Sequence, residues 1–232
     1  MKLIIRKLIN KVSIFKILFN ILKYILGKAS LTSVSPIYFD GWKMATGTRT
    51  PWINGGSSAL SCHFSETDSK LKRLVAEKKI ILTQFKPQNV LAELEGLMWR
   101  HYIVYWSANY AIKNTKSKTK IFAEFGVCDG LTIFYAISAA KNLDEPFKIY
   151  LYDAWDEMKE EFLLDSEKTS AGSYSYLSLE NTKNNLNHLN VKELIYNKGY
   201  IPGVFDRADN PKELAWMHID LNSSMPTINT LE

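Results

Sequence analysis

The pattern of apolar and polar positions changes near residue 120. From there on, short apolar runs alternate with segments of helical periodicity. The runs that predict strands are KIFAEFGV, PFKIYLYDAW, KELIYNKG and LAWMHIDLN, and the segments that predict helices are LTIFYAISAAKNL and SLENTKNNLNHL. Apolar strands that alternate with helices form a parallel sheet. The pattern therefore predicts an α/β fold with about four parallel strands over residues 119–232.

The residues ahead of this region predict helices and a loop. SETDSKLKRLVAEKK, residues 65–79, has a capping-box start followed by helical periodicity. Residues 88–113 are apolar all round and predict one long buried helix. Arg100 and His101 lie within it, and we interpret both as the polar edge of a packed helix. Residues 29–118 thus form a loop, rich in Ser, Thr, Gly and Pro at its start, and then a helical region.

The first 28 residues predict a separate basic amphipathic helix. Residues 1–30 hold seven Lys and Arg side chains and no acid, and the polar positions gather on one side of a helix. Lys interrupts the apolar run too often for a spanning helix, and no cleavage site for a signal peptide follows. The segment is interpreted either as an interfacial helix at an anionic membrane or as a helix packed on the body or on a partner subunit.

Charge and cysteine content narrow the function classes. Without residues 1–30, the chain holds 29 − 7 = 22 basic and 24 acidic side chains, so the body is not a nucleic-acid-binding domain by charge. Its two cysteines, Cys62 and Cys128, are too few for a disulfide framework and indicate reduced thiols in the cytoplasm. We expect a cytoplasmic protein with a small-molecule or glycan substrate, and no nucleic acid as a partner.

Unusual polar and glycine residues fall at the carboxyl ends of all four predicted strands. In an open α/β sheet, ligands bind at that edge. The residues are Glu124, Gly126, Asp129 and Gly130 after the first strand, Asp153 after the second, Gly199 and Tyr200 after the third, and Asp220 and Asn222 after the fourth.

The turn after the first predicted strand, EFGVCDG, suits a cationic ligand better than a phosphate. Only two glycines are present, so the dinucleotide fingerprint is absent. Glu124 and Asp129 would repel a pyrophosphate but suit a sulfonium or an ammonium group. Asp153 can accept hydrogen bonds from both hydroxyls of a ribose. A glycine turn with helix-capping acids would explain Gly126 and Asp129 without a ligand, but it leaves Asp153 unexplained.

These residues resemble a known family. EFGVCDG, YLYDAW, NKGY and HIDLNSSMPTINTLE are similar to class I S-adenosylmethionine-dependent methyltransferases, and within them to the macrocin O-methyltransferase (TylF-like) family. DGWKMATGTRTPW is similar, less specifically, to the loop ahead of the domain. The resemblance covers residues 119–232. It implies a Rossmann-like sheet and O-methylation of a sugar, glycan or natural-product hydroxyl.

The resemblance also implies a role for each strand end. Glu124, Gly126 and Gly130 would line the methionine portion of S-adenosyl-L-methionine, and Phe125 and Asp129 belong to the same cofactor-binding turn. Asp153 would hold the ribose beside Ala154 and Trp155, and Gly199 and Tyr200 would lie near the adenine.

The end of the fourth predicted strand carries the expected catalytic and metal-binding residues. The family's acid-x-acid pattern, which helps bind a divalent metal, maps onto Asp220 and Asn222. Asn supplies an oxygen suited to Mg²⁺ but removes one charge. A metal there would lower the pKa of a sugar hydroxyl. His218 lies on the same side of the strand as Asp220 and could act as a base, or it could be a strand histidine satisfied by a neighbour.

Two further expectations concern the segment after the second strand and the end of the sequence. WDEMKEEFLLDSEK is either a lid over the cofactor or a solvated acidic helix. The family carries a second acidic pair on later strands, which are absent before Glu232. We therefore expect a fragment of a longer protein with an open sheet edge. Such an edge favours association, including a homo-oligomer, and the fragment should show little methyl transfer by itself.

Two other function classes remain open at this point. One is a non-catalytic module that uses a methyltransferase-like fold and the basic segment 1–28 to dock at a membrane. The other is a nicotinamide-dependent oxidoreductase, which the missing third glycine disfavours.

Overall fold

The structure, a computed structural model, describes residues 39–40, 43–44 and 59–232. The chain divides into two units, Met1–Thr48 and Arg49–Glu232. In the first unit, strands β1 (Phe39–Asp40) and β2 (Lys43–Met44) pair antiparallel. The predicted leader helix over residues 1–28 lies outside the described residues, as does most of the predicted loop that follows it.

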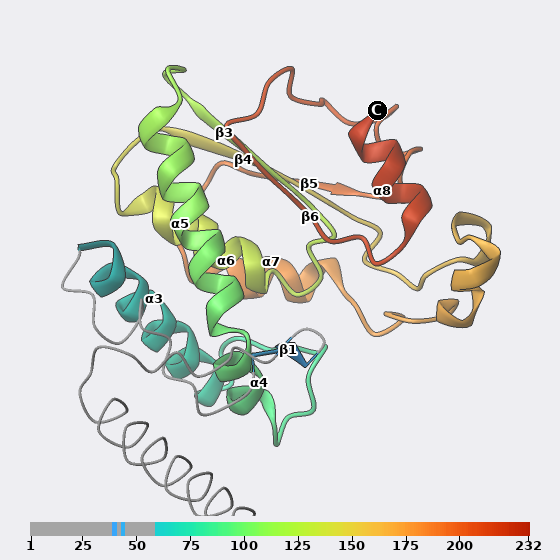
Figure 1. The fold of residues 1–232 in the computed structure, drawn as a ribbon, viewed down its shortest axis with the longest axis horizontal. Coiled ribbons are helices and arrows are strands. Elements are labelled where there is room, and N and C mark those ends of the chain that lie inside the picture. The colour runs from blue at the N-terminus through green and yellow to red at the C-terminus, as the bar shows by residue number, and fades with distance from the viewer. Residues whose placement is uncertain (1–38, 41–42, 45–58) are drawn as a thin grey trace, which may run out of the picture. The chain divides into compact units, whose positions relative to one another are not determined.

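A four-stranded parallel sheet is the centre of the second unit (Figure 1). Its strands are β3 (Lys120–Phe125), β4 (Phe147–Asp153), β5 (Leu194–Lys198) and β6 (Trp216–Ile219), in the order β5-β4-β3-β6. In the register, Phe125 at the end of β3 lies opposite Tyr152 of β4 and Ile219 of β6. All four strands therefore end at the same edge of the sheet, as their sequence pattern predicts, and the predicted α/β fold class is confirmed.

Helices cover one face of this sheet and a loop covers the other. Helices α5 (Met98–Asn114), α6 (Leu131–Lys141) and α7 (Leu179–Asn187) lie on one face (Figure 1). Helix α3 (Ala59–Ala76) packs in turn on α6 and α5, so that α6 is buried nearly all round. On the other face, Ile201 and Val204 of the loop after β5 pack on apolar strand residues.

The helical region ahead of the sheet differs from its prediction in three respects. The helix expected over residues 65–79 begins earlier, at Ala59, and ends at Ala76, so the predicted capping box lies inside it; there the Asp68 carboxylate accepts from Tyr135 Oη and pairs with Lys72. The helix expected over residues 88–113 is divided into α4 (Val90–Gly96) and α5, since glycine is a poor helix former. His101 is not a polar edge: it is buried, and its ring stacks on Tyr135 at 4.4 Å between centroids.

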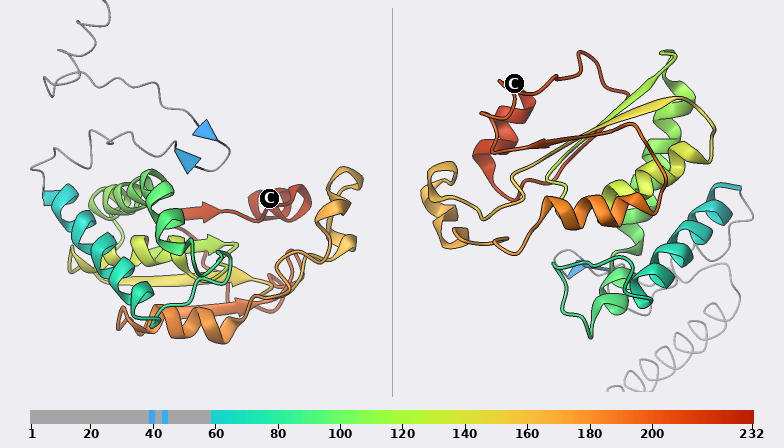
Figure 2. Two further views of the ribbon diagram at one scale, coloured as in Figure 1. Left: turned by 90° about the horizontal axis from the view of Figure 1, so that it is seen from below. Right: turned by 180° about the vertical axis from the view of Figure 1, so that it is seen from behind.

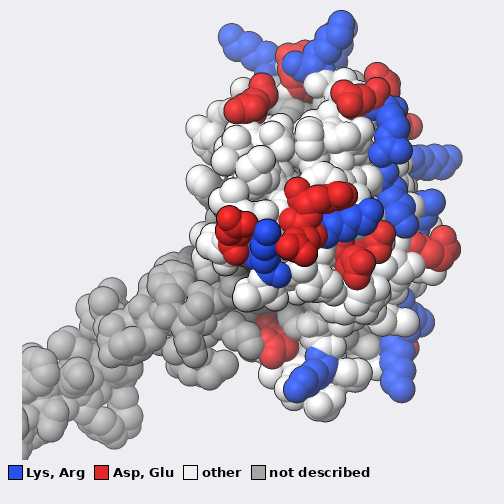
Figure 3. Space-filling model, turned by 90° about the vertical axis from the view of Figure 1, so that its right-hand side faces the viewer, with Lys and Arg blue, Asp and Glu red and all other residues white. Residues whose placement is uncertain are grey.

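The acidic segment after β4 is neither one helix nor part of the sheet. It forms two short 3₁₀ turns, η1 (Glu160–Phe162) and η2 (Asp165–Ser170), and extends beyond the carboxyl ends of the strands (Figures 1 and 2). Glu167 accepts hydrogen bonds from the backbone N–H and the hydroxyl of Ser224, at the start of α8 (Ser224–Leu231). Viewed from the right-hand side of Figure 1, the surface carries a group of acidic side chains near its middle, with Lys and Arg side chains among them (Figure 3).

No helix in the described part of the chain is both long and apolar enough to cross a membrane.

Candidate functional site at the carboxyl ends of the strands

The turn from β3 into α6 requires glycine at two positions. Gly126 has a φ of +86° and Gly130, which caps the amino end of α6, has a φ of +82°. A Cβ on Gly126 would lie 2.0 Å from the carbonyl oxygen of Asp220. Gly126 is therefore needed for its backbone conformation and also for the close approach of the chain that leaves β6.

Asp153 supports this turn from the neighbouring strand. Its Oδ2 accepts a hydrogen bond from the backbone N–H of Cys128 at 2.8 Å, and its Oδ1 accepts one from that of Trp155 at 2.6 Å. Burial raises the pKa of Asp153, although these backbone hydrogen bonds act in the opposite direction. The side chain of Asp153 thus lies against the glycine turn. An ionised carboxylate has about four lone-pair sites, so hydrogen bonds to a ribose remain chemically feasible.

The residues after Asp153 fasten the turn to helix α7. Trp155 is buried, with a φ of +43°. Its Nε1 donates to the hydroxyl of Thr182 at 2.9 Å and to the carbonyl of Cys128 at 3.1 Å. Ala154 is half-buried between Asp153 and Trp155. Trp155 thus holds the turn in place, and a contact with a cofactor stays a prediction for both residues.

Asp129 is buried within the protein and does not present its carboxylate to an open site. It accepts hydrogen bonds from Thr83 Oγ1 at 2.9 Å, from the backbone N–H of Gln84 at 3.2 Å and from Asn181 Nδ2 at 2.7 Å. Burial raises its pKa, against the effect of these bonds. The contacts show Asp129 joining the loop before α4 to α7, and they lend no support to its predicted role beside a cationic ligand.

Glu124 and Phe125 point to opposite faces of the sheet, as successive strand residues do. Glu124 is fully buried, and its Oε1 lies 2.9 Å from Nδ1 of His218, the residue opposite it on β6. Its Oε2 has no hydrogen-bond partner among the described residues. Burial raises the pKa of Glu124, while the contact with His218 lowers it. Phe125 stacks on Tyr152 on the other face, with ring centroids 4.7 Å apart.

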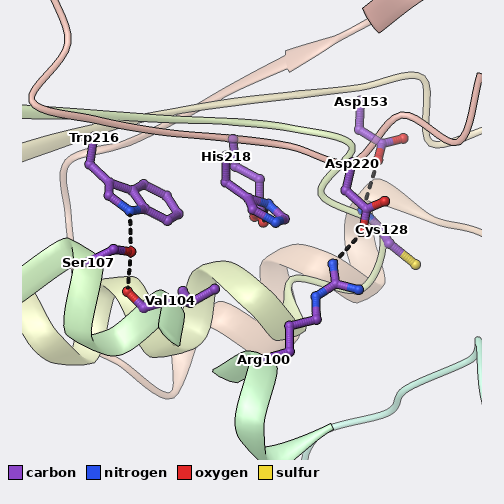
Figure 4. Close-up of polar contacts among 9 residues, drawn as sticks. Arg100, Val104, Ser107, Cys128, Asp153, Trp216, His218 and Asp220 are labelled. Atoms are coloured by element: carbon purple, nitrogen blue, oxygen red, sulfur yellow. Dashed lines mark hydrogen bonds and ion pairs between the residues drawn. The ribbon is translucent and has the colours of Figure 1, made fainter. Parts of the chain in front are cut away.

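Every second residue from the start of β6 faces helix α5: Trp216, His218 and, just past the strand, Asp220 (Figure 4). Trp216 Nε1 donates to the hydroxyl of Ser107 at 2.9 Å. At the other end, the guanidinium of Arg100 forms an ion pair with the carboxylate of Asp220. His218 lies between these two contacts (Figure 4). One nitrogen of His218 is thus satisfied by a neighbour, Glu124, as the simpler interpretation of this strand histidine predicts.

Arg100 pairs with Asp220 at the end of β6, although its place in an apolar helix predicts only a polar edge. A signal was present in the spacing: Arg100, Val104 and Ser107 recur at helical intervals and therefore share one face. Which strand that face meets is decided by the packing of α5.

The residues at the end of β6 do not fit a divalent metal site. Asn222 is exposed and has a φ of +55°, and the carboxylate of Asp220 is already paired with Arg100. In the part of the chain that the structure describes, no group of three or more His, Cys, Asp or Glu side chains could hold a metal ion. Mg²⁺ needs oxygen ligands in near-octahedral geometry, with carboxylates to balance its charge. The predicted Mg²⁺ at Asp220 and Asn222 is therefore not supported.

The end of β5 anchors the acidic segment that follows β4. Gly199 has a φ of +155°, and its N–H donates to the carbonyl of Asp153 at 2.9 Å. The hydroxyl of Tyr200 donates to the carbonyl of Glu157 at 2.7 Å. The Tyr200 ring stacks on Phe162 at 5.0 Å, and Lys159 Nζ lies 4.6 Å from its centroid. Tyr200 therefore holds residues 157–162, and its predicted place beside an adenine stays a prediction.

Comparisons with known proteins support the fold. No protein-family model and no curated protein matches the sequence. Among solved structures, the O-methyltransferase NovP matches with a TM-score of 0.54 and 14% identity, over 74% of this chain and 77% of that chain. The calicheamicin methyltransferase CalS11 matches with a TM-score of 0.45 and 17% identity, over 76% and 73%. The similarity to NovP shows that this chain has the fold of an O-methyltransferase, in agreement with the Rossmann-like sheet predicted from the sequence.

Proposed function

We propose that this protein binds S-adenosyl-L-methionine at the carboxyl ends of β3, β4 and β5 and transfers its methyl group to a hydroxyl of a sugar or natural product. The observation that carries the proposal is the glycine turn after β3, held against Asp153 of the next strand. This arrangement lies at the ligand-binding edge of a sheet whose fold is that of the O-methyltransferase NovP.

The residues at this edge fit a nucleoside bearing an amino acid. Gly126 and Gly130 give the turn positive φ angles that residues with a Cβ rarely adopt, and so let the backbone turn at the edge where ligands bind in such sheets. Asp153 retains lone pairs for ribose hydroxyls after its two backbone hydrogen bonds. The short loop 199–200 and the segment 157–162 are joined through Tyr200, and they border the same edge.

The chemistry asks little of the protein beyond alignment and removal of a proton. S-adenosylmethionine supplies an activated methyl group: the acceptor oxygen forms a C–O bond as the C–S bond breaks, and the electron pair of that bond stays on sulfur. The proton of the acceptor hydroxyl passes to a base of the protein. We assign this base to Asp220, which lies just past the end of β6 and against Gly126. His218 lies two residues before Asp220 on the same side of the strand, and its proposed role is to help position Asp220.

A titration tests the binding half of the proposal. The 232-residue chain should bind S-adenosylmethionine in isothermal titration calorimetry. Asp153→Ala should weaken binding by about 1.5 to 3 kcal/mol, as expected for lost hydrogen bonds to a charged acceptor. Glu145→Ala is the matched control, because this exposed acid precedes the opposite end of β4.

The result also separates the alternatives. Binding that is unchanged by Asp153→Ala would show that this carboxylate does not hold the ribose. A chain that binds reduced nicotinamide cofactor, measured by its fluorescence, would favour the oxidoreductase. A chain that binds neither cofactor would favour a non-catalytic module.

We further propose that residues 1–28 place this enzyme at an anionic membrane surface, as a cytoplasmic peripheral protein. The support is their charge, since residues 1–30 carry seven basic side chains and no acid. Vesicles containing phosphatidylserine should bind the full chain and lose it as salt rises. A chain that starts at Ser30 should not bind. Equal binding of both chains would contradict the proposal.

A further inference from the structure

The carboxylate of Asp220, just past the end of β6, is already paired with a cationic side chain. Arg100 reaches Asp220 from α5, and both side chains are largely shielded, at 21% and 24% exposure. Arg100 is held in this place by the packing of its helix, because Ser107, two turns further on, is hydrogen-bonded to Trp216 at the start of β6 (Figure 4).

The charges around Asp220 leave little attraction for a divalent ion. Among the described residues at this edge, Glu124 is buried against His218 on the helix side of the sheet, and Asp153 accepts hydrogen bonds from two backbone N–H groups. The position where a second acid would stand is Asn222, which is neutral and exposed. A metal ion at Asp220 would have to share one carboxylate with a guanidinium, and the repulsion between the two cations doubles for a divalent ion.

We propose that Arg100 takes the place of a divalent metal ion at the end of β6, so that Asp220 and the acceptor hydroxyl are positioned without metal. The catalytic part of this inference, that Arg100 positions Asp220 for the reaction, rests on the proposed methyl transfer. Arginine suits the role, because its planar guanidinium stays charged at any physiological pH and binds carboxylates in fixed geometry. Arg100 is a positioning residue, since it acts through Asp220. An acceptor with a single hydroxyl then suffices, because no pair of hydroxyls is needed to chelate a metal.

Mn²⁺ binding tests the inference without any need for turnover. The probe is Mn²⁺ alone, followed by the loss of its free electron paramagnetic resonance signal in the presence of the full chain. The wild-type chain should show no saturable site tighter than roughly 1 mM. Arg100→Met should bind Mn²⁺ at least about tenfold more tightly, because the Asp220 carboxylate is released and a neighbouring positive charge is removed. Asp220→Asn in the Arg100→Met background should abolish that gain.

Lys72→Met is the matched control. Lys72 is a similarly shielded cation, at 22% exposure, that pairs with Asp68 on α3 and with Glu95 on α4 and takes no part in the site. Any Mn²⁺ binding that Lys72→Met gains from the released carboxylates of Asp68 and Glu95 should persist when Asp220→Asn is added, whereas the gain in Arg100→Met should depend on Asp220.

Two results would overturn the inference. One is a tight Mn²⁺ site in the wild-type chain that Asp220→Asn removes, and the other is an Arg100→Met variant that gains no affinity. Failure of the chain to bind S-adenosylmethionine would refute the proposed function instead, and the Mn²⁺ results would still decide whether Arg100 occupies the place of a metal.

Where methyl transfer is measured, two more readouts apply. Addition of EDTA should change the rate of methyl transfer by the wild-type chain by less than about twofold. Arg100→Met should lower kcat with little change in S-adenosylmethionine affinity, and Arg100→Lys should restore part of the loss. A wild-type rate abolished by EDTA and restored by Mg²⁺ would contradict the inference.

Discussion

The turn after β3 and the end of β6 meet at one edge of the sheet, but different interactions hold them. The turn is fixed through the backbone, by positive φ angles at glycines and by N–H groups that donate to Asp153. The end of β6 is fixed through side chains, by the contacts of Arg100 and Ser107 of α5 with Asp220 and Trp216. The backbone conformation of the turn is therefore fixed by the turn itself. At the end of β6, by contrast, a single side-chain substitution can change the local charge without altering the backbone.

The largest expected effect lies where the two regions touch. Gly126→Ala should destabilise the full chain by about 4 kcal/mol, through backbone strain and a Cβ placed 2.0 Å from the Asp220 carbonyl oxygen. Gly172→Ala is the control, because Gly172 also has a positive φ, +78°, but nothing lies within 4 Å of its added Cβ. It should cost only about 1 kcal/mol. Urea unfolding measures both, and equal losses would show that close approach does not matter at Gly126.

A smaller loss is expected where the turn is joined to its surroundings. Asp129→Ala should cost about 3 kcal/mol in urea unfolding, because it leaves the N–H of Gln84 and the amide of Asn181 without their buried acceptor. Asp165→Ala, at an exposed acid that pairs with Lys168 in its own segment, should change stability by less than about 0.5 kcal/mol. Similar values for the two would mean that Asp129 is free to face a ligand.

On helix α5, stability should depend on pH through His101. Its pKa is lowered to about 3 by burial, and further by the charges of Arg100 and Lys72. The folded state therefore favours the neutral ring, so stability is present above the unfolded pKa of about 6.5 and is lost as pH falls below it. Between pH 7 and pH 5 the loss from this group should be about 2 kcal/mol.

His101→Phe tests this dependence, because it keeps a ring against Tyr135 and removes the titrating group. The variant should lose less stability than the wild type between pH 7 and pH 5 in urea unfolding. Parallel curves for the two chains would contradict the prediction.

The smallest effect is expected at the ion pair itself. Arg100 and Asp220 are partly exposed, so their coupling energy in a double-mutant cycle of Arg100→Met and Asp220→Asn should be below about 1 kcal/mol. The pair would then matter for the charge of the site more than for folding. A coupling of about 3 kcal/mol or more would show instead that the pair behaves as a buried one and that α5 depends on it.

Much of the fold could be predicted because its signals are local. The strands β3 to β6 and the helices α6 and α7 follow from apolar periodicity, which reports burial within a few residues. The break after Gly96 and the early start of α3 at Ala59 could not be predicted with the same certainty. Both depend on weak local preferences, and the capping-box pattern at Ser65 falls inside α3 and does not start it.

The sequence by itself determined where the polar residues of the site stand along the chain, and the tertiary structure decided which way each one faces. Gly126, Gly130 and Asp153 predict the ligand-binding edge of the sheet, because the strand ends of a parallel sheet meet there. Glu124 and Asp129 look equally suited to a ligand in the sequence, yet both are buried and bonded within the protein. Arg100 stands 120 residues from its partner Asp220. Their pairing depends on how α5 packs under β6, and no local pattern encodes the choice of partner across a packed interface.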